Sequence, residues 1–589
     1  MAVIMREYVH KLTAKIKQKE KVISAAAFLM FIVFALITGL HHEPWTDEAQ
    51  SWLIARDTNW TQLFSVMAYE GSPALWPIVL KIFISFGLEY QNLFIVPLIF
   101  STLGVWLLIY KSDFPLLIRV FLPFTYYIFY QYTIVARSYS LILPCIQLIV
   151  LFYKDRLRKP YIFGILLIVL SGISVHAMIL SGILFLFYCW DILKIMKANA
   201  PSRQIIANSA VVGVIALSYL LTVSYLIPPA DLSFVAAKFD WNLLNIITRF
   251  CVLIGEALIF NTSTMYSFIV MGVIAAIFAL VYQGNGKFYI ICTSICLFLS
   301  CFYCNKWHIG LIFLSFLLAL QLFSPTLKAK DTRIRYAVYV LIGIVFCVQI
   351  SWGIRTATYD CRNSHSGAYA AAEFIKENRY DQTRIYGLGY CSTAIEPYFN
   401  TNIYKNRTTA YYLWSLNNGD LTNQQIVNNL PDVVVYSEFD SDDYTDITAM
   451  FIRSGYRSYS FTGATFIKDS VYETQTYTVF VRDNKDIEKT DIKTGMYVGK
   501  PYDIASSFMP IITLENNNKF TFELGIGMAI EGSYTQDENK ITFNAADGER
   551  YVFGVSEEKL IIEQEIPKRV RQNTVFKYSP SCDELLGKN

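Results

Sequence analysis

The sequence predicts a polytopic α-helical membrane protein with a polar C-terminal part, and three observations support this prediction. Of the 589 residues, 54% are hydrophobic and only 16% are charged, which is too apolar for a soluble protein. The apolar residues gather in runs close to the 20 or so residues that span a bilayer as a helix. From about residue 354 onward the composition turns polar. We therefore expect a membrane domain over residues 1–353, followed by smaller domains.

The charge balance excludes one large class of function. The formal net charge is only +3, so nothing indicates that the protein binds nucleic acid. Most of the eleven cysteines fall in apolar segments, where packing explains them better than metal binding does. The positions of lysine and arginine relative to the apolar runs are more informative than the total charge.

The first apolar run, residues 22–40, sets the orientation of the chain. A lysine-rich segment precedes it, and no small-residue cleavage site follows it. The positive-inside rule places this segment in the cytoplasm, and the run is an anchor rather than a removed signal peptide. The loop after residue 40 is therefore expected outside the cell membrane.

Further apolar runs continue the bundle. They cover residues 91–110, 115–131, 139–153, 161–193, 205–227, 265–283, 288–304, 309–323 and 336–352. The run 161–193 is too long for one crossing, so we expect two helices that turn near residues 172–176.

Two apolar stretches, residues 72–87 and 243–260, are ambiguous because they contain charged residues. If both lie on the outer surface as juxtamembrane helices, the basic loops, including residues 154–159 and 328–335, all become cytoplasmic. We therefore predict about eleven transmembrane helices, two juxtamembrane helices and extracytoplasmic C-terminal domains.

The acidic pair Asp47-Glu48 follows the first crossing on the outer side. Such a pair can simply cap a helix. The predicted topology, however, leaves few cations on this side, and Arg137 and Lys306 are two of them. Ionisable groups at membrane depth are costly unless they are paired or used.

These outer groups suit the chemistry of a phosphate-bearing lipid substrate. Asp47 and His176 are candidate ligands for Mg²⁺ or Mn²⁺ beside phosphate oxygens. Arg137, Lys306 and His308 could hold a phosphate leaving group. The alternatives are a packed histidine at 176 and cationic side chains that only snorkel to the interface.

The order of these pieces resembles the type C (GT-C) integral membrane glycosyltransferases, such as the protein O-mannosyltransferases and the aminoarabinose transferases. The resemblance covers roughly residues 20–353 and rests on the following segments: Asp47-Glu48, residues 70–76, Arg137-Ser138-Tyr139, His176-Ala177 and residues 306–310. It implies that Asp47 is the catalytic carboxylate with Glu48 in support. It also implies that Arg137, Tyr139, Lys306 and His308 bind the donor phosphate.

The resemblance further implies an enzyme of a bacterial cell membrane that moves a sugar from a polyprenyl-phosphate donor to an acceptor on the outer face. The acceptor, a glycan, lipid or protein, stays open. Ser72 departs from the family, because some members carry Lys or His there. Two other functions remain as alternatives: a transporter or flippase, and a membrane-anchored sensor or assembly protein with an exported binding domain.

The polar C-terminal part is long enough for two domains. Residues 354–487 alternate helical and strand patterns, which predicts an α/β domain. Residues 488–589 contain short strands separated by turn clusters such as residues 516–518 and 546–548, which predicts a small antiparallel β module, either a barrel or a sandwich. We expect binding or accessory roles for both.

Overall fold

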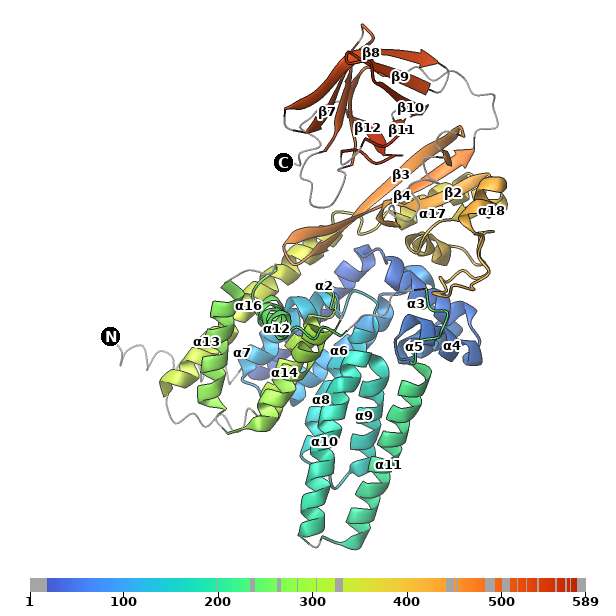
Figure 1. The fold of residues 1–589 in the computed structure, drawn as a ribbon. Coiled ribbons are helices and arrows are strands. Elements are labelled where there is room, and N and C mark those ends of the chain that lie inside the picture. The colour runs from blue at the N-terminus through green and yellow to red at the C-terminus, as the bar shows by residue number, and fades with distance from the viewer. Residues whose placement is uncertain are drawn as a thin grey trace. The chain divides into compact units, whose positions relative to one another are not determined.

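The computed structural model describes residues 19–579, with gaps at 199, 234–238, 262–265, 283, 303, 324–331, 441–449, 452–453, 483–492, 501–508, 516, 526, 538–539, 557–558, 567–568 and 573. The chain forms two compact units (Figure 1). The first contains residues 1–366, 411–418 and 463–474, and the second contains the remainder.

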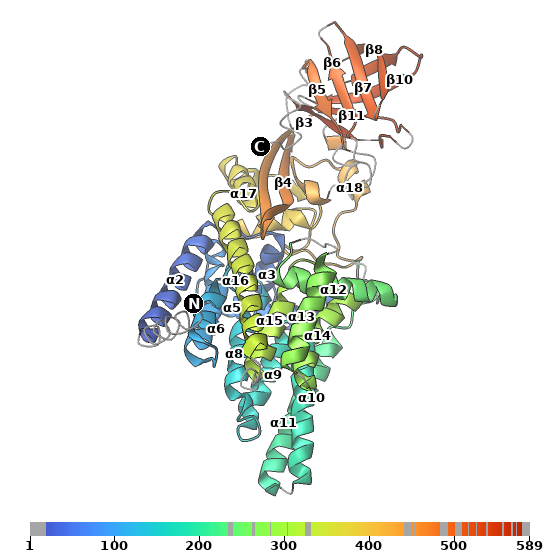
Figure 2. The same cartoon turned by 90° about the vertical axis from the view of Figure 1, so that its left-hand side faces the viewer.

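The first unit is helical, as predicted. Its helices are α2 (Glu20–His41), α3 (Thr46–Asp57), α4 (Trp60–Glu70), α5 (Leu75–Ser85), α6 (Ile95–Lys111), α7 (Leu116–Phe121), α8 (Ile142–Tyr153), α9 (Pro160–Ile173), α10 (Val175–Lys197), α11 (Ser202–Tyr225), α12 (Leu243–Leu258), α13 (Tyr266–Val281), α14 (Gly286–Cys301), α15 (Gly310–Phe323) and α16 (Thr332–Asp360). Figure 2 shows α9, α10 and α11 side by side.

Several of these helices have the length and composition of membrane spans. Within the described residues five such segments are found: Glu20–His41, Tyr90–Lys111, Val175–Lys197, Ser202–Tyr225 and Ala337–Asp360. Shorter apolar helices, including α9, α13, α14 and α15, cover most of the other predicted runs. The membrane class is therefore supported by five spans, while the count of eleven crossings stays a prediction.

The predicted run 161–193 does form two helices. They are α9 and α10, and they meet at Ser174, whose side chain accepts a hydrogen bond from the Ala177 N–H and caps α10. Serine is a favoured helix cap because its oxygen satisfies a free backbone donor in the first turn.

The predicted single helix over residues 115–131 is wrong. After α7 the chain forms a 3₁₀ turn at Leu122–Phe124 and a π-helical turn at Tyr127–Gln131. Pro123 cannot donate a helical hydrogen bond, which breaks the regular ladder. The irregular backbone is tolerated because this segment is buried inside protein.

The loop predicted after the first crossing contains two helices, α3 and α4. Asp47 and Glu48 lie in the first turn of α3, where the Trp45 N–H donates to the Glu48 carboxylate at 3.1 Å. Asn59 caps α4 through the N–H groups of Thr61 and Gln62. The contact of Glu48 agrees with the capping alternative for the acidic pair. The helix α3 itself was not predicted, because it is too mixed in polarity to show a helical period.

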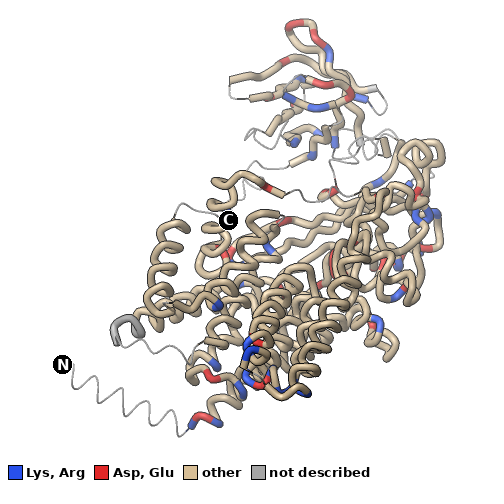
Figure 3. Tube along the Cα trace, turned by 60° about the horizontal axis from the view of Figure 1, so that its bottom comes forward, with Lys and Arg blue, Asp and Glu red and all other residues tan. Residues whose placement is uncertain are grey.

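Several ion pairs of the helical unit lie at one of its ends, and charged residues are sparse along its helices (Figure 3). Arg119 pairs with Glu20, and Lys154 lies 3.5 Å from Asp113. Asp191, near the end of α10, accepts from Arg156 at 2.6 Å and lies 3.6 Å from Lys287. The segments that carry these basic residues therefore share one end of the unit.

The second unit begins with an α/β part, as predicted. It contains α17 (Ala368–Glu377), β1 (Ile385–Gly387), α18 (Asn423–Asn428), β2 (Val433–Ser437), β3 (Tyr456–Ile467) and β4 (Ser470–Arg482). The sheet order is β1-β2-β4-β3, with β1 parallel and β4 antiparallel to β2. The turn of the β3–β4 hairpin belongs to the helical unit. The sequence pattern also predicts a helix over residues 443–454, and this segment lies mostly outside the described residues.

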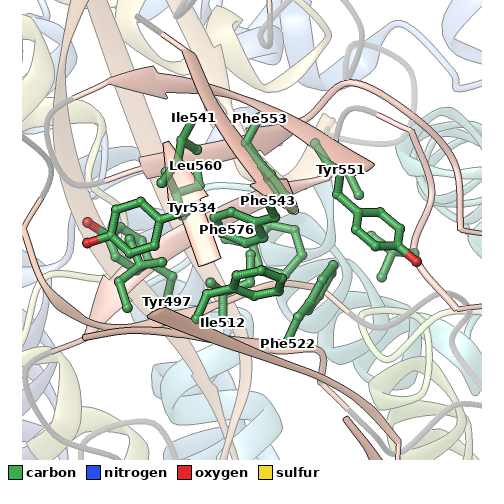
Figure 4. Packing of buried hydrophobic residues seen from close by; sticks show 14 of the residues in the cluster. Tyr497, Ile512, Phe522, Tyr534, Ile541, Phe543, Tyr551, Phe553, Leu560 and Phe576 are labelled. Carbon is green, nitrogen blue, oxygen red and sulfur yellow. The ribbon is translucent and has the colours of Figure 1, made fainter. Parts of the chain in front are cut away.

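The predicted β module is a closed barrel. Its strands are β5 (Gly495–Val498), β6 (Ile511–Leu514), β7 (Lys519–Gly525), β8 (Met528–Asp537), β9 (Lys540–Ala545), β10 (Arg550–Ser556), β11 (Lys559–Ile562) and β12 (Val575–Ser579). Aromatic rings such as Phe522, Phe543, Phe553 and Phe576 converge inside it (Figure 4). The interior is a packed core, as expected for an eight-stranded barrel.

Candidate functional site

Asp47 and Arg137 form the centre of the candidate site. The Arg137 guanidinium donates to the Asp47 carboxylate, and both side chains are about one quarter exposed (26% for Asp47 and 29% for Arg137). Asp47 is held by the first turn of α3, and Arg137 stands immediately before the 3₁₀ turn Ser138–Leu141. The structure thus brings together two residues that the sequence analysis selected independently.

Two further carboxylates interact with Asp47. Glu70 ends α4 and accepts a hydrogen bond from Gln50 at 2.8 Å. Burial, with a smaller contribution from Asp47, raises the pKa of Glu70 to about 7, although Gln50 and Arg137 oppose the shift. Glu473 lies in the turn region of the β3–β4 hairpin, and burial together with Asp47 raises the pKa of Glu473 to about 7. The candidate site therefore holds carboxyl groups that exchange protons near neutral pH.

The predicted histidines and Tyr139 lie together. The rings of His176 and His308 are 4.3 Å apart, and the Tyr139 ring is 6.2 Å from that of His308. Burial, followed by His176 and Arg137, holds the pKa of His308 well below its usual value. The His308 ring is therefore neutral, and its Nδ1 accepts a hydrogen bond from the Asn305 N–H at 3.3 Å.

The sequence analysis grouped Lys306 with Arg137 and His308 as phosphate-binding residues. In the structure, the contacts of Lys306 are with other residues. Its ammonium lies 4.9 Å from the Tyr472 ring centre, and it interacts electrostatically with Glu256 and Lys468. Lys468 donates to the carbonyl oxygens of Glu256 at 2.7 Å and Phe260 at 3.1 Å, so it stabilises the C-terminal end of α12.

Glu48 faces away from Asp47 into the protein interior. Its side chain is fully buried and accepts from the Ala136 N–H at 2.5 Å and the Trp45 N–H at 3.1 Å. Its Oε2 also lies 3.2 Å from Nε2 of His42. Because Ala136 directly precedes Arg137, Glu48 links the start of α3 to the segment that presents Arg137. The catalytic support by Glu48 that the resemblance implies stays a prediction.

A second polar cluster, which the sequence analysis missed, adjoins Glu48. Nδ1 of His42 lies 2.8 Å from the Asp360 carboxylate, and Nδ1 of His365 lies 3.2 Å from its other oxygen. The Tyr130 hydroxyl donates to Asp360 at 2.6 Å. Burial lowers the pKa of His42, but the carboxylates of Glu48 and Asp360 outweigh it and raise the pKa to about 10. No sequence spacing could reveal this cluster, since its members are up to 323 residues apart.

The metal ligands predicted from sequence were Asp47 and His176. Among the described residues, the group whose potential ligand atoms converge is a different one, His42, Asp360 and His365. A metal bound by Asp47 and His176 therefore stays a prediction.

Comparisons of the chain with protein families, with curated proteins and with solved structures found no match. The function must be inferred from the geometry and from the sequence resemblance. Chemically, the site offers a carboxylate base, a guanidinium that can bind an anion, and neutral imidazole, all at the ends of apolar helices.

Proposed function

We propose that this protein is a membrane glycosyltransferase that moves a sugar from a polyprenyl-phosphate donor to an acceptor. The observation that supports this proposal best is the partly exposed Asp47–Arg137 pair at the ends of apolar helices. A transferase of this class needs a base for the acceptor and a cation for the departing phosphate, and this pair supplies both.

The reaction can be written with these two residues. The acceptor hydroxyl oxygen forms a bond to the anomeric carbon of the sugar while the bond from that carbon to the phosphate oxygen breaks. Asp47 accepts the hydroxyl proton, and the electron pair leaves with the polyprenyl phosphate. Arg137 binds the phosphate through paired N–H donors. Donor binding would draw Arg137 away from Asp47 and so release the carboxylate to act as the base.

The proposal also includes the predicted divalent cation and further contacts of the protein with the donor. Asp47 and His176 would hold Mg²⁺ or Mn²⁺, which would supply additional positive charge near the phosphate. Tyr139 and His308 lie close enough together to bind one donor headgroup. Lys306 would contact the phosphate from the side of Tyr472.

An apolar cavity in the helical unit offers a contact surface for one short segment of the lipid chain of such a donor. It has a volume of about 70 Å³ and is lined by side chains of α7, α12, α13, α15 and α16, among them Ile118, Leu258, Phe278, Phe316 and Val345. A polyprenyl chain binds by burial of apolar surface and needs no polar partner. Lipid donors also explain why the sequence contains no phosphate-binding glycine loop.

The proposed location is the outer face of a bacterial cell membrane. Eleven crossings, with α5 and α12 as juxtamembrane helices, would place Asp47, Arg137 and the second unit outside. Neither alternative function is favoured by a specific observation. The ionisable groups gather at helix ends, whereas a transporter places them near the middle of its helices.

The test is an assay of the purified protein with a panel of polyprenyl-phosphate sugars, in which release of free polyprenyl phosphate is measured. We expect Asp47→Asn to lower the transfer rate at least about 10²-fold, because general-base catalysis contributes about 10²–10⁴-fold. The matched control is Asp113→Asn, since Asp113 is exposed and pairs with Lys154 at the other end of the unit. A folded Asp47→Asn variant with full activity would remove Asp47 from the reaction.

A further inference from the structure

The buried cluster of His42, Asp360 and His365 is the most unusual group of polar residues outside the proposed transfer site. The exposed fraction of each side chain is 1% or less. One nitrogen of each histidine and one oxygen of Asp360 lie within 4.8 Å of one another. Two imidazoles and a carboxylate form a donor set that suits zinc and similar divalent ions.

The surroundings of the cluster match those of a bound metal. A histidine that ligates a metal usually donates its other N–H to a carboxylate, which fixes the orientation of the ring. Glu48 occupies this position, 3.2 Å from Nε2 of His42, and is itself fixed by the Ala136 N–H. Tyr130 donates to Asp360 at 2.6 Å, as expected for a supported carboxylate ligand.

The charge balance favours a dication over protons. Glu48 and Asp360 are two fully buried carboxylates, and buried charge must be compensated. Full compensation by protons would require two adjacent imidazolium rings, whose centres are only 4.8 Å apart; protonation of His42 alone leaves one negative charge. A single divalent cation balances both carboxylates while both imidazoles stay neutral.

We propose that His42, Asp360 and His365 bind a structural Zn²⁺ ion, with Glu48 in support of His42. The second oxygen of Asp360 and the Tyr130 hydroxyl, which donates to Asp360 at 2.6 Å, are groups that could complete four-coordination. An ion at about 2.0–2.2 Å from each ligand would replace the hydrogen bonds that His42 and His365 now make with Asp360. It would connect the end of α2, the end of α16 and the chain that leaves α16, in addition to any role of the protein in sugar transfer.

The test uses the full-length protein purified with an affinity tag that contains no histidine. The protein is treated with a chelator and supplied with Zn²⁺, and excess metal is removed before the metal content is measured by mass spectrometry. We expect about one bound Zn²⁺ per chain for the wild type. We expect Asp360→Asn and His365→Ala to lose it, and Glu48→Gln to bind it about 10–100-fold more weakly.

Two variants test whether the ion binds at this cluster rather than at other histidines. His41→Ala is the matched control, because His41 neighbours His42 but is exposed at the end of α2, and it should keep the ion. His176→Ala should also keep it; loss of the ion in that variant would overturn the proposal and support a metal at the transfer site instead.

If the ligand variants fail to fold, a measurement on the wild type still tests the proposal. X-ray absorption of the zinc-loaded wild type should show two imidazole nitrogens with oxygen ligands. A wild type that binds no stoichiometric Zn²⁺, or a spectrum without imidazole ligands, would overturn the proposal. The cluster would then be a network of hydrogen-bonded ion pairs around a protonated His42.

Discussion

Adjacent residues in this chain have very different environments, as Asp47 and Glu48 illustrate. The sequence marks the pair as unusual, but neighbouring positions on a helix point about 100° apart, so only one of them can face the site. Asp47 is partly exposed beside Arg137, whereas Glu48 is fully buried. The pairing with Arg137 could not be predicted in detail because it depends on a contact across 90 residues.

Glu70 gives a prediction of pH dependence. Burial raises the pKa of Glu70 from 4.5 to about 7. Between these two pH values, the folded state therefore keeps a proton on Glu70 that the unfolded chain has lost. This contribution to stability is fully present below pH 4.5 and disappears as the pH rises through 7. We expect Glu70→Gln to be more stable than the wild type at pH 8, by about 1–3 kcal/mol, and little different at pH 4.5.

Thermal unfolding in detergent at pH 4.5 and pH 8 would measure the effect of Glu70→Gln. Glu89→Gln is the matched control, because Glu89 is exposed and should show no such dependence on pH. A stability difference between Glu70→Gln and the wild type that is the same at both pH values would contradict the prediction.

At the level of elements, the length of an apolar run predicted well where a helix occurs. It did not predict whether that helix is continuous. Residues 22–40 and 205–227 correspond to α2 and α11 within three residues at each end. Residues 115–131, a run that also contains Arg119 and Pro123, form no continuous helix. Tyr127 and Tyr130 in this segment donate to Glu256 O and Asp360. Pro123 is one local signal for the break, whereas these hydrogen-bond partners are distant in sequence and leave no local pattern.

The ammonium of Lys468 is one of the groups that hold the turn of the β3–β4 hairpin, and its contribution can be tested. Lys468 has a positive φ of 63° and is buried, with its ammonium 4.5 Å from the Trp352 ring centre. Lys468→Met keeps the volume but leaves the carbonyls of Glu256 and Phe260 without this donor. We expect a loss of stability of about 1–3 kcal/mol, measured by thermal unfolding.

The control for Lys468→Met is Val471→Ala, because Val471 lies in the same hairpin but is 52% exposed. It should unfold like the wild type. An unchanged melting temperature for Lys468→Met would show that the hairpin turn is held by other contacts.

Close packing of α6 against α8 depends on Gly104. A Cβ atom there would lie 2.9 Å from the backbone nitrogen of Pro144 and 2.8 Å from Leu143 Cγ, so the helices would have to separate. Small residues allow such close approach between membrane helices. We expect Gly104→Ala to lower stability by about 1–3 kcal/mol, measured by thermal unfolding.

Gly213→Ala is the matched control for Gly104→Ala. Gly213 lies inside α11, where a Cβ would meet no atom within 4 Å, so the substitution should be neutral or stabilise by up to about 1 kcal/mol. Equal effects of the two substitutions would show that close packing at Gly104 is unimportant.

At the scale of the whole molecule, the sequence predicted a helical part, an α/β part and a β module, but it did not predict that the β module closes into a barrel. The turn clusters near residues 516–518 and 546–548 indicated hairpins. The strands β7, β9 and β10 adjoin these clusters, as this pattern predicts. Closure of the barrel requires β12 to pair with β5. Pairing of such distant strands leaves no periodic signal, which is why the sequence could not distinguish a barrel from a sandwich.

The orientation of the whole chain in the membrane is the last prediction. Ion pairs connect Glu20 with Arg119 and Asp113 with Lys154, so the predicted cytoplasmic segments lie at the same end of the helical unit. An even number of crossings separates segments on the same side, and the positive-inside rule assigns the basic side to the cytoplasm. Eleven crossings therefore place Lys154 inside, and Thr61 and Tyr369 outside.

This orientation can be measured in intact cells with a membrane-impermeant thiol reagent and variants in which a single cysteine is introduced into a cysteine-free background. The positions Lys154, Thr61 and Tyr369 are all exposed, so reactivity reports the side of the membrane rather than burial. We expect Thr61→Cys and Tyr369→Cys to react in intact cells, and Lys154→Cys to react only after permeabilisation. Reaction of Lys154→Cys in intact cells would rule out the eleven-crossing topology. Protection of Thr61→Cys would place Asp47 in the cytoplasm, where a donor displayed on the outer face could not reach it.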